Sequence, residues 1–81
     1  MSSIFLEAFM DFSERLKSLR IEKNFTQADF AKSVGMSLRA YQYYETGVQE
    51  PTLSKLIALA DFFGVSIDYL VGRTDNPAVN K

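Results

Sequence analysis

The positions of the four glycines constrain this chain most, because each follows a stretch whose apolar residues recur with the period of a helix. Each stretch also begins with a serine or a threonine, residue types that commonly cap a helix N-terminus. A glycine after the last turn allows the left-handed backbone in which many helices end. The sequence therefore predicts four short helices joined by tight turns, over residues 26–35, 37–47, 52–64 and 66–72.

A longer helix is predicted before these four. No glycine or proline interrupts residues 2–23, and the apolar residues there recur at steps of four and three, at Phe5, Phe9, Phe12, Leu16 and Leu19. No segment alternates polar and apolar residues as a strand does. We expect an all-α fold of five short helices around one core, with a helical extension at residues 1–11 and a flexible tail at residues 73–81.

The absence of two residue types limits the chemistry. The 81 residues include no cysteine and no histidine. The chain therefore lacks the usual zinc ligands, cannot form a disulfide, and has no Cys/His or Ser/His pair for nucleophilic catalysis. We expect a protein that is not an enzyme and that holds no metal and no cofactor.

The net charge and the N-terminal sequence of the chain limit which partners it could bind and where in the cell it could lie. The net charge of −1 gives no general attraction for polyanions, so nucleic-acid binding would require a local basic face. The apolar N-terminus has no basic segment before it and is interrupted by Glu7 and Asp11. We therefore expect neither a signal peptide nor a membrane span, and place the protein in the cytoplasm.

The helix predicted over residues 37–47 carries two different faces. Helical spacing puts Ala40, Tyr41 and Tyr44 on one side, which suits the core. The opposite side gathers the candidate ligand-binding side chains Leu38, Arg39, Gln42 and Tyr43. Arg39 is the only cation of this helix.

One ungapped register holds four motifs: LR at 19–20, FTQADFAKSVGMS at 25–37, YYETG at 43–47 and EPTLSKLIALADFFGVSIDYLVG at 50–72. Together they resemble the phage repressor/Cro (Xre) family of transcriptional regulators. The resemblance implies a lambda-repressor-like domain over residues 12–72 that contains a helix-turn-helix and binds a double-stranded DNA operator.

The resemblance also implies roles for single residues. Gln27 is similar to a family glutamine that contacts a phosphate and supports the recognition helix, which corresponds here to residues 37–45. Arg20 and Glu45 are similar to a pair that forms a structural ion pair beneath that helix. The residues expected to contact DNA are Gln27, Ser37, Leu38, Arg39, Gln42, Tyr43 and Thr46.

The chemistry of these side chains fits base recognition. A guanidinium in the major groove can donate two hydrogen bonds to guanine, a glutamine amide can pair with adenine, and a leucine can contact a thymine methyl group. Backbone amides at the N-termini of the two motif helices suit phosphate oxygens. The sequence departs from the family at residues 48–50, Val-Gln-Glu, where a cation is common. We therefore expect few phosphate contacts, with Arg15, Lys17, Lys32 and Lys55 as other cations that could flank the groove.

The N-terminal extension has more apolar residues than one core requires. We expect Ile4, Leu6 and Met10 to take part in a homodimer on a palindromic operator, or, alternatively, the extension to cover the bottom of the core. The leading interpretation is a repressor. The alternative is a protein-binding accessory module, such as an antitoxin or co-regulator, with a repurposed helix-turn-helix.

Overall fold

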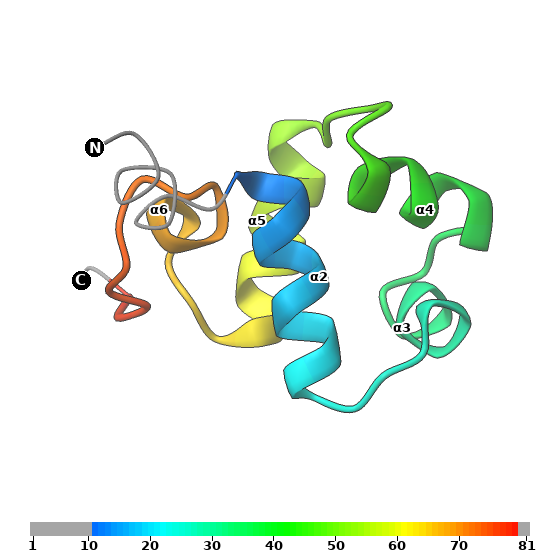
Figure 1. Ribbon diagram of the computed structural model, residues 1–81, viewed down its shortest axis with the longest axis horizontal. Coiled ribbons are helices and arrows are strands. Elements are labelled where there is room, and N and C mark those ends of the chain that lie inside the picture. Colours follow the sequence, from blue (N-terminus) through cyan, green and yellow to red (C-terminus); the bar gives the residue numbers. More distant parts are fainter. Residues whose placement is uncertain (1–10, 80–81) are drawn as a thin grey trace, which may run out of the picture.

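The computed structural model describes residues 11–79, and every regular element in this part of the chain is a helix (Figure 1). Its elements are α2 (Phe12–Glu22), α3 (Gln27–Ser33), α4 (Leu38–Thr46), α5 (Leu53–Phe63) and α6 (Ile67–Leu70). The predicted all-α fold of five short helices is confirmed. Residues 1–10 of the predicted N-terminal extension, with Ile4, Leu6 and Met10, lie outside the described residues.

Each helix begins at a side chain that accepts a hydrogen bond from the backbone N–H three residues later. The acceptors are Asp11, Thr26, Ser37, Thr52 and Ser66. These bonds satisfy N–H groups that have no partner within a helix. The four short helices therefore begin at the serine and threonine residues from which their starts were predicted.

The first helix differs from the prediction. The backbone of Asp11 is extended (φ −74°, ψ 174°), and its carboxylate accepts from the N–H of Glu14 at 2.9 Å. An aspartate at this position satisfies a free N–H and places negative charge at the positive end of the helix dipole. The predicted helix over residues 2–23 is therefore interrupted at Asp11, the residue before the first residue of α2.

Two glycines end helices as predicted. Gly47 follows α4 with φ 82°, and Gly64 follows α5 with φ 69°. Residues with a side chain rarely adopt this left-handed backbone. The two glycines therefore fix where the third and fourth helices of the described chain stop.

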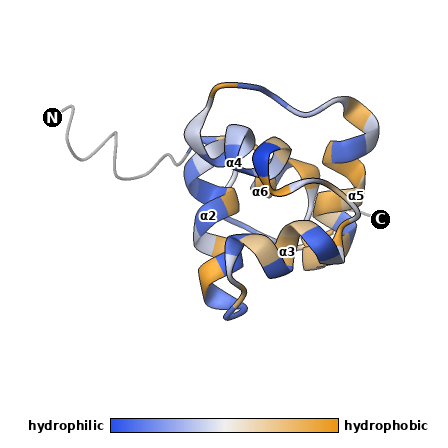
Figure 2. Cartoon of the chain, turned by 90° about the vertical axis from the view of Figure 1, so that its right-hand side faces the viewer, coloured by the Kyte–Doolittle hydropathy of each residue, from blue (hydrophilic) through white to orange (hydrophobic). Residues whose placement is uncertain are grey.

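The core lies where the helices meet around Phe30. In Figure 1, α3 and α4 lie to one side of α2 and α6 lies to the other, and Figure 2 shows hydrophobic residues concentrated along α5. The Phe30 ring is fully buried and lies 5.0 Å from the Tyr41 ring and 5.2 Å from the Phe63 ring, between centroids. The other buried hydrophobic residues are Leu16, Leu19, Ala31, Tyr44, Leu59, Ala60, Val65 and Leu70.

Three apolar residues of α5 are exposed in the structure. Leu53 is 69 % exposed, Ile57 is 42 % exposed and Phe62 is 41 % exposed. The helix carries more apolar residues than one buried stripe can hold, so those at its margins face outward. Phe62 still contacts the core through its ring, 5.2 Å from that of Phe30.

Arg15, one of the four cations that could flank a DNA groove, is buried in the structure. Its residue is only 6 % exposed, and its guanidinium carbon lies 3.8 Å from the centroid of the Tyr69 ring. Its Nη2 lies 3.3 Å from a carboxylate oxygen of Asp75. The backbone carbonyl of Pro77 accepts from the N–H of Ser66 at 3.0 Å. The tail therefore lies against the helices at least as far as Pro77.

We predict that Phe30→Ala lowers the free energy of unfolding by about 3 to 5 kcal/mol, because it leaves a cavity in the centre of the core. Phe62→Ala is the matched control: it removes the same atoms from a ring that is 41 % exposed, and should cost less than half as much. Urea unfolding followed by circular dichroism measures both. Equal losses would show that Phe30 is not the centre of the core.

Candidate nucleic-acid interface

The α3 and α4 helices pack against each other and are joined by a tight turn. The N–H of Met36 donates to the carbonyl of Ala31 at 2.9 Å, and Gly35 has φ 73°. Ser37 then accepts from the N–H of Ala40 at 3.1 Å and begins α4. Two short helices with this connection form a helix-turn-helix.

The two faces of α4 are divided as its spacing predicted. Tyr41 is fully buried and Tyr44 is 7 % exposed, so both fix the helix to the core. Leu38, at 42 %, and Arg39 are exposed near the N-terminal end of the helix. Gln42 and Tyr43 are half-buried, farther along the same outward side.

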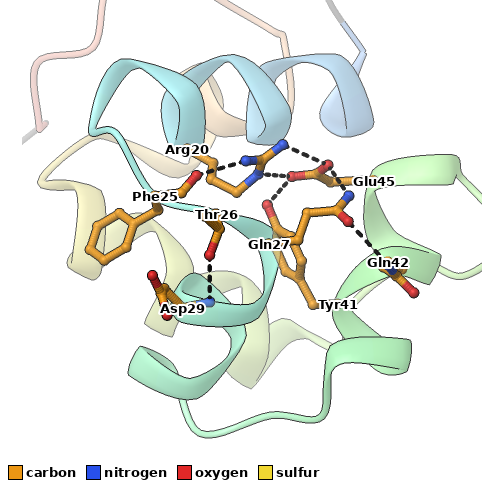
Figure 3. Close-up of polar contacts among 8 residues, drawn as sticks. All are labelled: Arg20, Phe25, Thr26, Gln27, Asp29, Tyr41, Gln42 and Glu45. Carbon is orange, nitrogen blue, oxygen red and sulfur yellow. Dashed lines mark hydrogen bonds and ion pairs between the residues drawn. The ribbon is translucent and has the colours of Figure 1, made fainter.

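A buried carboxylate lies at the inner end of this site (Figure 3). The Glu45 side chain is 3 % exposed, and its Oε2 accepts from Arg20 Nε at 2.7 Å and from the Tyr41 hydroxyl. Its Oε1 accepts from Gln27 Nε2 at 2.9 Å. Arg20 also donates to the carbonyl of Phe25 at 2.7 Å, which ties the chain before α3 to the same cluster.

The hydrogen bonds decide the charge of this cluster. Burial acts to raise the pKa of Glu45, but the hydrogen bonds from Arg20, Tyr41 and Gln27 outweigh it, so this pKa lies below its usual value. The hydrogen bond to Glu45 also raises the pKa of Arg20. Burial is the largest cause that raises the pKa of Tyr41, and the hydrogen bond to Glu45 is the second; together they raise this pKa well above its usual range. At neutral pH the cluster therefore holds an ionised glutamate, a charged arginine and a neutral tyrosine.

Gln27 lies between this cluster and the outward face of α4. Its Nε2 donates to Glu45, and its Oε1 accepts from Gln42 Nε2 at 3.1 Å. The sequence did not reveal the pairing of the two glutamines, because their separation of 15 residues has no helical or turn periodicity. Only the packing of α3 on α4 brings them together.

Other side chains near α4 have partners within the protein. The Thr46 hydroxyl donates to the carbonyl of Gln42 at 3.0 Å within the helix. The Ser13 hydroxyl, from α2, donates to the carbonyl of Tyr44 at 2.7 Å. Nothing in the sequence indicated this role of Ser13, which satisfies a carbonyl near the C-terminal end of α4 and holds that end against α2.

The charges around α4 are few. Arg39 and Lys32 are exposed, whereas the connection after α4 contributes Glu50 and an exposed Val48. Within residues 11–79, no group of three or more acidic residues is placed to hold a metal ion. No helix in that range is long and apolar enough to cross a membrane.

We predict that Glu45→Gln weakens folding at neutral pH, because Arg20 keeps a buried charge without a counter-ion; breaking a buried pair costs about 3 to 5 kcal/mol. Since the folded-state pKa of Glu45 is lowered, its contribution is present above the unfolded value of about 4.3 and is lost as the pH falls through the folded value. The difference in unfolding free energy between wild type and Glu45→Gln should therefore shrink from pH 7 to pH 3. A constant difference in urea titrations would contradict an ionised Glu45.

Comparison with known proteins agrees with this geometry. The family model described as helix-turn-helix matches residues 16–70. The cryptic phage CTXphi transcriptional repressor RstR of Vibrio cholerae is 44 % identical over 64 residues, which cover 79 % of this chain and 57 % of RstR. The regulator YobD of Bacillus subtilis, of the same helix-turn-helix type, is 36 % identical over 66 residues, covering 82 % of this chain and 59 % of YobD.

A solved structure shows the same fold. The P22 c2 repressor, crystallised in complex with a synthetic operator, superposes with a TM-score of 0.71 and 32 % sequence identity, over 76 % of this chain and 94 % of that one. The chain spans less than two thirds of the length of RstR and YobD. With the match at residues 16–70 and these identities, the chain belongs to the phage repressor/Cro (Xre) family of helix-turn-helix proteins.

Proposed function

We propose that this protein binds double-stranded DNA at specific sequences and regulates transcription as a repressor, by occupying a palindromic operator as a homodimer. The observation that carries the proposal is how α4 packs in the protein. Its inner side is fixed by Tyr41, Tyr44 and Glu45, and its outer side exposes Leu38 and Arg39. A rigid helix with an exposed polar face matches the shape of the major groove. The function is binding in the cytoplasm, without a catalytic step.

The outward residues of α4 have distinct roles in this proposal. Arg39 donates two hydrogen bonds to guanine O6 and N7, Gln42 pairs with adenine, and Leu38 contacts a thymine methyl group. Tyr43 packs beside the bases or donates its hydroxyl to a phosphate.

Backbone contacts position the helix in the groove. The first N–H groups of α4, together with the Ser37 hydroxyl, face a phosphate at the positive end of the helix dipole. Thr46 contacts the sugar-phosphate backbone at the other end, and Gln27 does so from α3 through the amide hydrogen that its internal bonds leave free.

The homodimer is proposed because of the length of DNA that a specific binding site needs. A single recognition helix contacts too few base pairs to select one site in a genome. Two copies of the protein, on half-sites about one helical turn apart, are therefore needed. Ile4, Leu6 and Met10 supply the apolar contacts between copies in this proposal.

A second function is favoured by one observation. Leu38 is an exposed apolar residue at the start of α4, and the connection after the helix adds exposed Val48 and the negative charge of Glu50. An apolar surface with few cations suits a protein partner better than a phosphate backbone. Under this alternative the chain is an accessory module, such as an antitoxin or co-regulator.

We predict that Arg39→Ala relaxes selection at one base pair of each half-site by about 1 to 3 kcal/mol. Selection of binding sites from a random duplex pool, at two salt concentrations, measures this. Arg73→Ala is the matched control, since it removes an exposed arginine from outside the helix-turn-helix. Enrichment of no duplex by the wild type, even at low salt, would favour the protein-binding alternative.

Deletion of residues 1–10 should yield a monomer that binds the operator weakly. Sedimentation equilibrium of the full and the shortened chain measures the change in mass. A shortened chain that remains dimeric would show that Ile4, Leu6 and Met10 do not form the contact.

A further inference from the structure

An apolar hollow lies beside the point where the described chain begins. Its volume is about 370 Å³. The residues that line it come from the start of α2, the connection between α4 and α5, α5 itself and the residue after α6: Asp11, Phe12, Glu50, Pro51, Leu56 and Val71. The four apolar residues among them are half-buried, and the two acidic ones are exposed.

Phe12 connects this hollow with the inner side of α4. Phe12 and Leu56 pack against the buried core, and the Phe12 ring meets the Tyr44 ring edge-on, at 6.4 Å between centroids. Tyr44 is one of the residues that fix α4 to the core. Apolar side chains beside an unfilled hollow lose dispersion contacts and keep surface in water, so an apolar occupant would stabilise this corner of the fold.

Residues 1–10 are joined directly to the hollow, because Asp11 is one of its lining residues. Seven of these ten residues are apolar. Phe9 precedes Asp11 by two residues, so its Cα lies within about 7 Å of that of Asp11. A segment tethered this closely has an effective concentration on the order of millimolar, which a separate partner rarely reaches. The tether therefore favours the chain's own N-terminal segment as the occupant.

The start of α2 explains why Phe9 needs such a site. In a continuous helix Phe9 would share a face with Phe12, three residues later. The backbone of Asp11 is extended, so that shared face is interrupted. An apolar residue before a helix often packs against the fourth residue of that helix, but here this residue is Arg15, which is bonded to Asp75. Phe12 is the one apolar residue in the first turn of α2, and it lines the hollow.

We propose that the Phe9 side chain docks in this hollow within the same chain. Its ring lies against Phe12 and Leu56, and residues 1–10 cover the corner between α2, α5 and the connection after α4. Since Pro51 belongs to that connection, the docked segment also holds the connection in place. The contact needs neither DNA nor a second copy, and the residues proposed for the dimer contact remain available.

The absence of cysteine allows a cross-linking test in the whole 81-residue chain. Ala8→Cys combined with Glu50→Cys introduces the only two thiols and keeps both the Phe9 ring and the apolar lining of the hollow. Treatment with a short bismaleimide should link the two cysteines within one chain. The linked product should therefore have the mass of a monomer at every protein concentration.

Two comparisons separate docking from the short tether alone. Ala8→Cys with Glu14→Cys is the matched control, because Glu14 is exposed and lies beside Lys17 and Ile21 in a different hollow on α2. This pair should link more slowly. Adding Phe9→Ser to the first pair should lower its rate of linking by about tenfold, toward that of the control, since burying an aromatic ring gains at least the roughly 1.4 kcal/mol that a factor of ten represents.

Thermal unfolding tests the contact without cysteines. Phe9→Ala and Leu56→Ala should each lower the melting temperature, and the double variant should lose less than the sum of both, because they remove the two sides of one contact. Ile57→Ala is the matched control for Leu56→Ala: Ile57 is the next residue of α5 and lines a different hollow, so its loss should add to that of Phe9→Ala. Leu56→Val replaces Leu56→Ala if the alanine variant does not fold.

The contrary outcomes each overturn the inference. Products of dimer mass that increase with protein concentration would place the segment in the hollow of a second copy. Equal linking at Glu50 and Glu14, a rate that Phe9→Ser leaves unchanged, or additive losses for Phe9→Ala and Leu56→Ala would show that the hollow does not hold Phe9. Neither measurement contains DNA, so failure here leaves the proposed operator binding standing, and failure of operator binding leaves this contact standing.

Discussion

The Glu45 carboxylate is the interaction on which the arrangement of the first three described helices depends. It accepts hydrogen bonds from Arg20 of α2, Gln27 of α3 and Tyr41 of its own helix. A buried charge is costly unless its hydrogen-bonding positions are filled, so the helices are stable together only where these donors converge. An apolar contact could slide by a fraction of a turn at little cost, whereas this cluster permits one register of α4 against α2 and α3.

That register determines what the rest of α4 can do. Because side chains three and four residues apart share a face, placing Tyr41, Tyr44 and Glu45 inward turns the N-terminal residues of the helix outward. The Ser13 hydroxyl holds the other end through the carbonyl of Tyr44. The surface that we propose for base recognition is therefore a consequence of contacts made on the opposite side of the helix.

What the sequence predicted well was local. Helix starts at Thr26 and Ser37, and a helix end at Gly47, depend on residues within one turn, so short-range patterns are enough to place them. The sequence predicted poorly what depends on neighbours in space. Nothing in the sequence indicates that Phe62 lies at the edge of the core, or that Arg15 contacts Asp75, 60 residues away. The Gln27–Gln42 bond was missed for the same reason. Resemblance to a family, rather than spacing, suggested that Arg20 and Glu45 pair.

The distribution of cations shows why orientation within the site matters. Two of the nine lysines and arginines, Arg15 and Arg20, are buried and bonded to carboxylates, so they cannot attract a phosphate backbone. Under the proposed function, counterion release, the term that gives most DNA-binding proteins affinity for any sequence, should therefore be smaller than nine free cations would give. A larger share of the proposed binding free energy must then come from contacts with base edges. Such contacts tolerate little misalignment, because a bidentate hydrogen bond is lost when either partner rotates. A recognition helix with few cations therefore gains more binding free energy than a strongly basic one from internal hydrogen bonds that hold its side chains in place.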